Sequence, residues 1–364
     1  MSQSPDILLI GQADHDNFGD SLIFAVYVAK LNALGINPKI VDATPIFMQR
    51  LSELGLSSTT IDRDQITNVQ RPAVAVFIGG GYLGQPELSW PKWQLRFIRD
   101  GVFLDIANKV RNAAIPLYVE GPEFGPYYGP FIKNYIKSVL SGAKSLVFRN
   151  TASLADAQKL GFSDAEYVPD VVLCSMDYLF PDFSTIETKH GLTVHATRKL
   201  FSDHWVAKRQ RALLAKVVAD HGFSDVSVLF DQRIPSIEEN AQTWLDELGV
   251  AKTQIVRYEG VEPLCRHLAS VSHVITTKLH VGVTALSLGK RVVCLSSGHK
   301  NRRFYQDVGL PGAIVDFYFT STSQKFAAIN AAFGASNVSK VDALKSFSAE
   351  YLTRVETLVD AERS

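Results

Sequence analysis

The residue types best suited to chemistry cluster between positions 273 and 289, where a β-branched run gives way to a helix of small residues. The predicted strand stops at Thr276-Thr277, and a cation, Lys278, and an imidazole, His280, follow. Charges, the helix dipole and free amides would converge at such a junction, which suits a phosphate or a carboxylate. A core histidine and a solvated surface lysine are the alternative interpretation of these two side chains.

Further cations follow two other predicted strands. Arg198 comes after the first strand of the second half, and its planar guanidinium can hold a phosphate or carboxylate at two points. Lys300, Arg302 and Arg303 come after a later strand. Arg302 and Arg303 fit a solvated loop at least as well as a site. Arg198, Lys278 and Lys300 are therefore the predicted anchors for an anionic ligand.

Small residues mark two turns in the first half of the chain. Asn17 and Gly19 precede a predicted helix, and Gly79, Gly80 and Gly81 are expected to end a buried apolar strand. Such residues let a ligand or another backbone approach closely and leave amides free at a helix start. The spacing is not that of a dinucleotide site. A turn capped by Asp20 and tight packing at the glycines are the alternatives.

The composition is that of a folded protein without a polyanionic partner. With 364 residues the chain exceeds the size of one core, and 46% hydrophobic with 20% charged residues is typical of globular proteins. Because 37 basic residues balance 37 acidic ones, nucleic acid is not expected as a partner. Three dispersed cysteines favour a reducing compartment. Without a secretion signal or a run of about 20 apolar residues, a cytoplasmic location is expected, with any membrane contact peripheral at the inner face.

Short β-branched runs alternate with segments of helical period, which predicts parallel strands joined by helices. In the first half we expect strands near residues 7–10, 39–41, 74–78, 116–119, 145–148 and 166–168, and helices at 21–34, 94–112 and 151–160. In the second half we expect strands at 192–196, 226–230, 254–257, 273–276, 291–295 and 313–315, and helices at 206–221, 237–248, 261–269 and 281–288.

The chain is expected to form two doubly wound, Rossmann-like α/β domains facing a cleft. Residues 1–180 would be the acceptor side and 190–335 the donor side, joined by a turn-rich stretch at 178–190. Residues 341–359 have the apolar stripe of one amphipathic helix, and the segment 340–364 is expected to pack back on the first domain.

Taken in order, these residues form a longer pattern. It consists of Asn17-x-Gly19-Asp20, Gly79-Gly80-Gly81, Phe148-Arg149-Asn150-x-x-Ser153, Pro169-Asp170-Val171-Val172, Lys278-Leu279-His280 before Ala285-Leu286-Ser287-Leu288-Gly289, and Lys300 before Leu310-Pro311. Over residues 7–312 this order and spacing resembles the polysaccharide pyruvyl transferase family. The resemblance implies a fold like that of the B-type glycosyltransferases, phosphoenolpyruvate as donor, and pyruvate ketals built on cell-surface glycans or exopolysaccharides.

The resemblance also implies roles for particular residues. The family's Arg-Leu-His motif falls on Lys278, Leu279 and His280, and its second donor-binding arginine on Arg198. Lys278 keeps the charge of the usual arginine but lacks the planar fork that grips an oxyanion in two places. Arg149 is interpreted as structural.

The expected chemistry is proton delivery to the methylene carbon of phosphoenolpyruvate, followed by attack of sugar hydroxyls. His280 is the candidate acid because imidazole exchanges protons near neutral pH. Asp14, Asp20 and Glu120, placed at strand ends of the first domain, are the candidate bases. Expected substrate-binding residues are Arg198, Lys278, Leu279, Asn17, Gly19, Gly79, Gly80, Gly81 and Lys300. No metal and no cofactor is expected beyond the co-substrate phosphoenolpyruvate.

Two other functions stay open: a nucleotide-sugar glycosyltransferase, because a fold does not assign a function, and a non-catalytic glycan-binding member of the family, suggested by Lys278. The acceptor, a glycan or a lipid-linked oligosaccharide, is not specified. Trp90, Trp93, Tyr127 and Tyr128 suit a sugar-stacking surface, a core or an oligomer interface equally. Homo-oligomerisation is left open.

Overall fold

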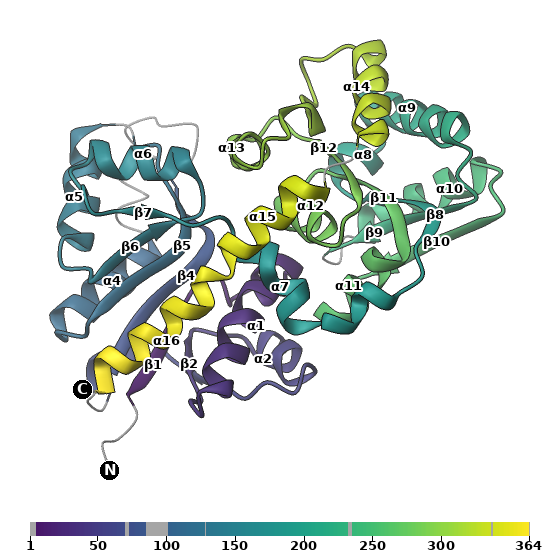
Figure 1. Ribbon diagram of the computed structural model, residues 1–364. Helices are drawn as coiled ribbons and strands as arrows, with labels where there is room; N and C mark the ends of the chain where they lie inside the picture. The colour runs from purple at the N-terminus through teal and green to yellow at the C-terminus, as the bar shows by residue number, and fades with distance from the viewer. Residues whose placement is uncertain are drawn as a thin grey trace. The chain divides into compact units, whose positions relative to one another are not determined.

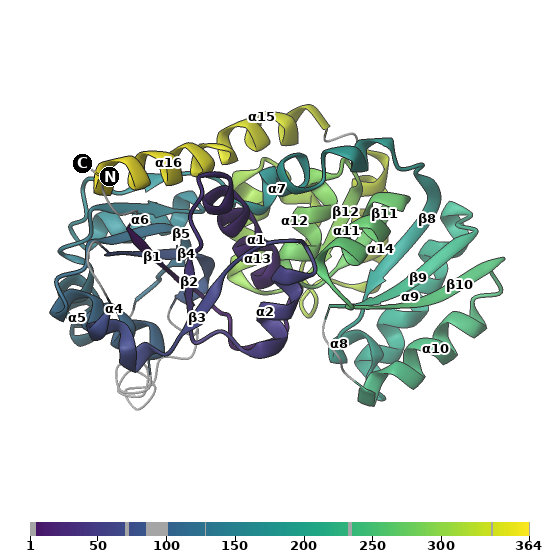
Figure 2. The same ribbon diagram turned by 90° about the horizontal axis from the view of Figure 1, so that it is seen from below.

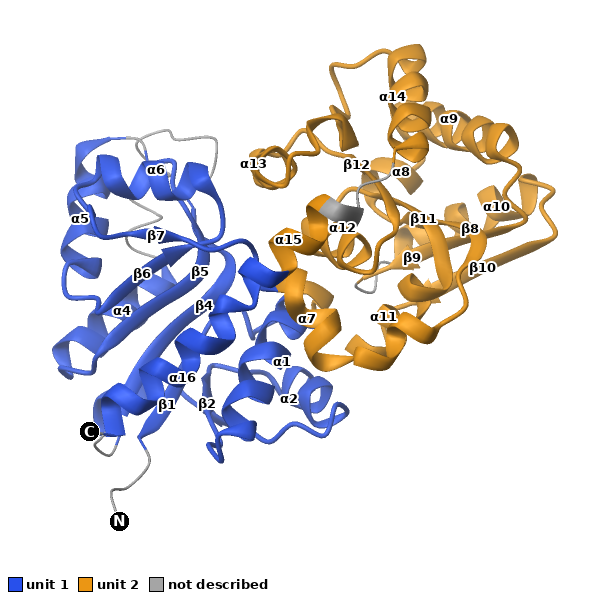
Figure 3. Cartoon of the chain, viewed as in Figure 1, with its two compact units in different colours: residues 1–16, 20–171, 346–364 blue, residues 17–19, 172–345 orange. Residues whose placement is uncertain are grey.

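Figure 1 shows a computed structural model of the protein, which describes residues 5–69, 73–84, 101–127, 129–231, 235–335 and 338–363. The chain forms two compact units (Figure 3). Unit 1 consists of residues 1–16, 20–171 and 346–364, and unit 2 of residues 17–19 and 172–345. The short segment 17–19 thus belongs to unit 2, although the residues on both sides of it in the sequence belong to unit 1.

Unit 1 is built on a parallel sheet in the order β3-β2-β1-β4-β5-β6-β7. Its strands are β1 Asp6–Ile10, β2 Lys39–Val41, β3 Thr59–Ile61, β4 Ala73–Leu83, β5 Leu117–Phe124, β6 Ser145–Phe148 and β7 Glu166–Tyr167. The central strands are apolar on both faces because helices cover both, as is typical of parallel sheets. β3 was not predicted. β4 was predicted to end before its glycines but continues through them to Leu83.

Two sets of helices cover the sheet of unit 1 (Figure 2). Helices α4 and α5 pack on one face in an apolar core, whereas α1 and α16 lie on the other, where Tyr118 of β5 donates to Glu362 over 2.9 Å. The helices are α1 Phe18–Ala33, α2 Pro45–Ser52, α4 Val102–Asn112, α5 Pro130–Leu140, α6 Thr151–Lys159 and the 3₁₀ helix Arg63–Asn68. The first part of the helix predicted at 94–112 lies outside the described residues.

The last segment is two helices, α15 Val338–Ser348 and α16 Glu350–Arg363, and not the single helix predicted. At the break, the Ser348 hydroxyl donates to the Asp170 carbonyl over 2.8 Å, and Tyr351 donates to the Val168 carbonyl over 2.9 Å. These bonds tie the start of α16 to the strand-end segment of unit 1, so tertiary contacts override a helical period that is continuous in the sequence.

Unit 2 repeats the architecture with a six-stranded parallel sheet in the order β10-β9-β8-β11-β12-β13. Its strands are β8 Lys189–His195, β9 Asp225–Phe230, β10 Lys252–Arg257, β11 Val271–Thr276, β12 Arg291–Leu295 and β13 Ile314–Val315. Its helices are α7 Val172–Leu179, α8 Arg198–Phe201, α9 Trp205–His221, α10 Glu238–Glu247, α11 Val261–Ser270, α12 Leu279–Ser287, α13 His299–Asp307 and α14 Thr322–Gly334, with 3₁₀ helices at Pro181–Thr185, Pro235–Ile237 and Pro311–Ala313.

The apolar core of unit 2 lies between the sheet and helices α9, α10 and α14. Helices α7, α11 and α12 pack together on the opposite face (Figure 2). The stretch predicted as a turn-rich connection from residue 178 contains the end of α7 and a 3₁₀ helix, both grouped with unit 2. The two sheets confirm the predicted fold class of two Rossmann-like α/β domains.

Candidate active site

The strand order of unit 2 reverses between β8 and β11, its topological switch point. In open α/β sheets, ligands bind outside the carboxyl ends of the strands at such a point. β8 ends at His195 and β11 at Thr276. Nδ1 of His195 lies 3.2 Å from the Thr277 hydroxyl, so a hydrogen bond joins the two strand ends directly. Lys278 and His280, which the sequence singled out, follow immediately.

A buried carboxylate pairs with two side chains at this switch point. Asp231, the residue after β9, has one oxygen 3.0 Å from Nε2 of His195 and the other 2.7 Å from Nζ of Lys278. Asp231 and His195 are buried, whereas 35% of the Lys278 side chain is exposed. One aspartate oxygen thus holds the lysine ammonium, while part of the Lys278 side chain stays exposed.

The charge of Asp231 follows from its surroundings. Burial by itself would raise the pKa of this carboxyl, but the contacts with His195 and Lys278 outweigh burial and hold the pKa well below its usual range. Asp231 is therefore ionised at neutral pH. A buried anion of this kind must stay paired, so removal of Lys278 would leave it with a large desolvation cost.

The turn from β11 into α12 is formed by local bonds. The Thr276 hydroxyl accepts from the Lys278 amide over 3.0 Å and donates to the Lys278 carbonyl over 2.9 Å. Lys278 occupies the N-cap position, but its ammonium can only donate and so makes no capping bond; it donates to Asp231 instead. The first turn of α12 therefore presents backbone amides next to a cation, as anion sites at helix starts do.

His280 lies against Gly19 in the first turn of α1. A Cβ placed on Gly19 would come within 1.9 Å of Nδ1 of His280, far inside van der Waals contact, so only glycine fits at this position. The Asn17 side chain accepts from the Gly19 amide over 2.9 Å and so begins α1. The predicted helix cap at Asp20 is wrong, because α1 starts at Phe18 and Asn17 makes this bond.

Helix α13 also contacts the turn between β11 and α12. Asn301 is buried and donates to the Ser296 hydroxyl over 2.7 Å and to the Thr277 carbonyl over 3.4 Å. Lys300 precedes it on the exposed side of the same helix. Arg198 is the first residue of α8, after β8, and is also exposed. Both predicted cations thus follow strands of this sheet at the carboxyl edge, and their role in binding stays a prediction.

The predicted glycines of unit 1 have a packing explanation. A Cβ on Gly79 would meet the side chain of Ile23 at 3.3 Å, and Gly80 has φ of 127°, which other residues rarely adopt. Gly81 lies in the same strand. The three glycines let β4 continue beneath α1, and nothing in their contacts identifies a ligand.

The three candidate bases have different environments. Asp14 is largely exposed, 3.3 Å from His15, and Asp20 is buried in the first turn of α1, next in sequence to Gly19. Glu120 lies in the middle of β5, not at a strand end as predicted. Burial raises the pKa of Glu120 to about 7, against smaller lowering contributions from the Ser145 hydroxyl and Arg354.

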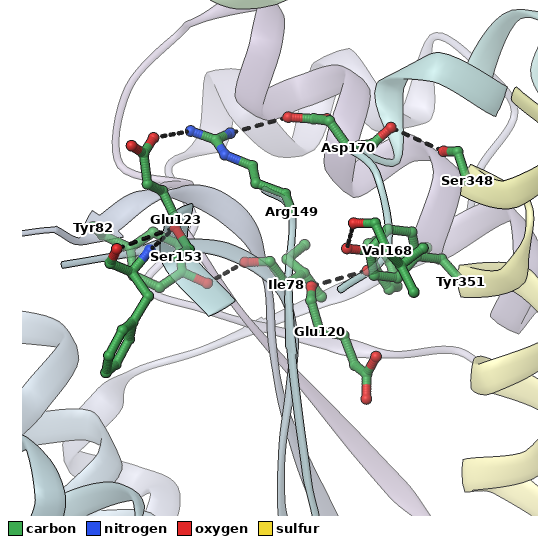
Figure 4. A network of polar contacts seen from close by, with 12 residues as sticks. Ile78, Tyr82, Glu120, Glu123, Arg149, Ser153, Val168, Asp170, Ser348 and Tyr351 are labelled. Atoms are coloured by element: carbon green, nitrogen blue, oxygen red, sulfur yellow. Dashed lines mark hydrogen bonds and ion pairs between the residues drawn. The ribbon is translucent and has the colours of Figure 1, made fainter. Parts of the chain in front are cut away.

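Figure 4 shows the polar network at the carboxyl edge of unit 1. Arg149 is buried between Glu123, at 2.8 Å, and Asp170, at 3.1 Å, while the Glu120 side chain points away from it. Asn150 caps α6 by accepting from the Ser153 amide over 2.8 Å. The interpretation of Arg149 as structural agrees with this pairing, since its donors face carboxylates inside the unit.

The proposed aromatic acceptor surface falls mostly on residues that the structure does not describe. Trp90, Trp93 and Tyr128 lie outside the described residues. Tyr127 is buried against Phe124, with ring centroids 4.9 Å apart, and fills the core of unit 1. Of the alternatives of a sugar-stacking surface, a core and an oligomer interface, Tyr127 therefore fits the core.

Sequence reasoning missed two residues of the site, His195 and Asp231. The sequence pattern places His195 in a strand and gives Asp231 no role. The available signal is position: both are polar residues at the carboxyl end of an apolar strand, in β8 and just after β9, which are neighbours on one side of the reversal in strand order. Their pairing with Lys278 carries no local sequence signature.

Solved structures with a similar fold include UDP-GlcNAc 2-epimerases. A UDP-GlcNAc 2-epimerase from Methanocaldococcus jannaschii shares 12% identity, with 98% of this chain and 100% of that chain covered and a TM-score of 0.58. A putative UDP-N-acetylglucosamine 2-epimerase from Listeria monocytogenes shares 10% identity, with 96% of this chain and 94% of that chain covered and a TM-score of 0.63. The UDP-N-acetylglucosamine 2-epimerase from Rickettsia bellii shares 10% identity, with 99% of this chain and 98% of that chain covered and a TM-score of 0.62. These similarities show a two-domain fold of the B-type glycosyltransferase class and nothing of the reaction. No curated protein matches the sequence.

The family model of the polysaccharide pyruvyl transferases matches residues 17–299. The match covers most of the chain. It includes both Gly19 and the Lys278–His280 turn, and Gly19 lies against His280 within unit 2. The protein belongs to the polysaccharide pyruvyl transferase family, a family of transferases that act on polysaccharides. Among the described residues, no helix is long and apolar enough to cross a bilayer.

Proposed function

We propose that the protein transfers the pyruvyl unit of phosphoenolpyruvate to two hydroxyls of a glycan and so forms a pyruvate ketal. One acceptor oxygen bonds to C2 of the donor while C3 takes up a proton. A second acceptor oxygen then bonds to C2 as the C2–O bond to phosphate breaks. One hydroxyl proton balances the proton gained at C3, and the other leaves with inorganic phosphate.

The observation that carries this proposal is the turn at the switch point of unit 2. The donor has a phosphate and a carboxylate, so it needs at least two anchors. Lys278, held by Asp231, and the backbone amides at the start of α12 provide two, and Arg198 at the end of β8 would provide a third. Lys278 thus replaces the usual arginine with an ammonium that a buried carboxylate orients.

His280 is proposed as the acid that protonates C3. It lies one residue beyond the anchoring turn and is held in place by Gly19, which leaves its ring no room on that side. Positioned acid catalysis contributes about 10²–10⁴-fold. Of the candidate bases, Asp20 is favoured because it follows Gly19 in the chain, whereas Asp14 and Glu120 have no such link to His280.

The first experiment compares ligands by thermal stabilisation. Phosphoenolpyruvate at 100 times its dissociation constant should add about 2.7 kcal/mol to the free energy of unfolding. UDP-GlcNAc serves as the competing ligand, because the structural neighbours include enzymes of that nucleotide sugar. Stabilisation by UDP-GlcNAc alone would support a nucleotide-sugar enzyme and contradict the proposal.

The second experiment measures phosphate release from phosphoenolpyruvate with a panel of oligosaccharides that offer paired hydroxyls. His280→Ala should lower turnover by about 10²–10⁴-fold, whereas Lys278→Ala should chiefly raise KM for the donor. His190→Gln, at the amino end of β8, is the matched control and should keep wild-type turnover. Wild-type turnover in a folded His280→Ala variant would remove His280 from the mechanism.

A further inference from the structure

Three aromatic side chains of unit 2 are unusually exposed. Phe319 is 90% exposed, Trp205 66% and Tyr318 55%. Phe319 and Tyr318 follow β13, and Trp205 begins α9. Most large apolar side chains of the described residues are buried, so these three are exceptions in a protein that otherwise has well-formed cores.

The loop that carries Tyr318 and Phe319 is held firmly. One oxygen of Asp316 accepts from the amides of Tyr318 and Phe319, at 2.9 and 2.8 Å, and from the Ser297 hydroxyl at 3.1 Å. The contacts keep the pKa of Asp316 below its usual value although burial opposes this. The exposed rings are therefore presented by a fixed turn, not by a segment without contacts of its own.

A basic side chain lies over one of these rings, and another joins the elements that carry them. Nζ of Lys199 lies 5.2 Å from the centre of the Tyr318 ring, and Arg209, one helical turn after Trp205, donates to Thr322 over 2.8 Å. These contacts bring α8, the start of α9 and the segment 318–322 together on one side of the unit. We call Lys199, Trp205, Arg209, Tyr318 and Phe319 the aromatic-basic patch. Within residues 199–209, three basic residues stand against one acidic residue, Asp203, a local excess in a chain of zero net charge.

We propose that the aromatic-basic patch docks the protein on an anionic lipid surface. Aromatic rings partition to the membrane–water interface, and basic side chains are attracted to anionic headgroups. The Phe319 phenyl group is 90% exposed, so nearly all of its apolar surface is available for insertion into the membrane interface. Zero net charge makes the attraction local, so the patch would set the orientation of unit 2 on the surface.

Vesicle co-sedimentation of the full chain tests this proposal. The protein should bind vesicles of phosphatidylcholine mixed with phosphatidylglycerol and bind pure phosphatidylcholine only weakly. Phe319→Ser should weaken binding about tenfold, because a buried phenyl group is lost, and Lys199→Glu by about fivefold or more. Added salt should weaken only the electrostatic attraction between the basic side chains and the anionic headgroups. Phe319→Ser should therefore still reduce vesicle binding at high salt.

Phe131→Ser is the matched control, because Phe131 is 79% exposed but lies on α5 of unit 1. It should leave vesicle binding unchanged. An equal loss in Phe131→Ser and Phe319→Ser, or no vesicle binding by the wild type, would overturn the proposal. So would binding of a soluble acidic polysaccharide that Phe319→Ser abolishes while vesicles are not bound.

The test is independent of the proposed reaction. Vesicle binding needs neither donor nor acceptor, and Phe319→Ser should keep wild-type phosphate release with a soluble oligosaccharide acceptor. If phosphoenolpyruvate is not turned over, the vesicle result still stands, and if vesicles are not bound, the transferase proposal is unaffected.

Discussion

At the scale of single residues, the site depends on two unusual fits. Asp231 is a buried anion that divides its two oxygens between His195 and Lys278. Gly19 occupies a position where any Cβ would overlap the His280 ring. The first fit orients a cation, and the second limits where an imidazole can lie. Both restrict side chains that would otherwise lose rotamer freedom on binding a ligand.

Gly19→Ala tests the second fit. Because the new methyl group would lie 1.9 Å from Nδ1 of His280, the ring must move, and a displacement of this size can cost about 100-fold in turnover. Gly312→Ala is the matched control, since a Cβ there meets nothing within 4 Å. The measurements are phosphate release and melting temperature. Wild-type turnover in a folded Gly19→Ala variant would show that the position of His280 does not matter.

At the scale of elements, α16 completes unit 1 although it is the last helix of the chain. Tyr351 is buried and donates to the Val168 carbonyl, and its ring lies 6.3 Å from that of Tyr27 in α1. Lys30 of α1 also pairs with Glu356. The helix therefore closes the face of the sheet on which Glu120 is buried, which explains why the carboxyl of Glu120 is desolvated.

Tyr351→Phe should lower the free energy of unfolding by about 1–2 kcal/mol, because the buried Val168 carbonyl loses its donor while packing is kept. Thr357→Ala, which removes an exposed hydroxyl from the same helix, should cost less than about 0.5 kcal/mol. Chemical denaturation monitored by fluorescence and circular dichroism gives both values. Equal losses in the two variants would mean that the Tyr351 bond does not hold α16 in place.

At the scale of the whole molecule, buried titratable groups of the two units contribute to the pH dependence of stability with opposite sign. In unit 2, burial lowers the pKa of His267 and of His273 to about 4, so below pH 6.5 the unfolded chain binds more protons than the folded unit. In unit 1, burial raises the pKa of Glu120 to about 7, so the folded unit binds more protons between pH 7 and 4.5. Over this interval acid therefore lowers the contribution of His267 and His273 to the stability of unit 2, whereas it removes the cost of a buried charge at Glu120 in unit 1.

The stability of unit 2 should fall as the pH is lowered from about 6.5 to 4, by roughly 3 kcal/mol from His267 alone. His267→Gln can still hydrogen-bond to Thr193 and Ser227 but does not titrate, so it should reduce this fall. Denaturation at a series of pH values checks the slope, with His15→Gln as an exposed control. An unchanged slope in His267→Gln would assign the pH dependence to other groups.

The sequence by itself determined the α/β class, most strand positions and the Lys278-Leu279-His280 turn, because apolar periodicity and strand-to-helix junctions are local patterns. Only the tertiary structure decided that Asp231 joins His195 to Lys278, since these partners are 36 and 47 residues apart and their pairing depends on the order of β8, β9 and β11. It also placed Gly19 against His280, buried Glu120 in mid-strand and divided the last helix at Ala349. Each of these features depends on which elements pack together, and a local pattern does not encode that choice.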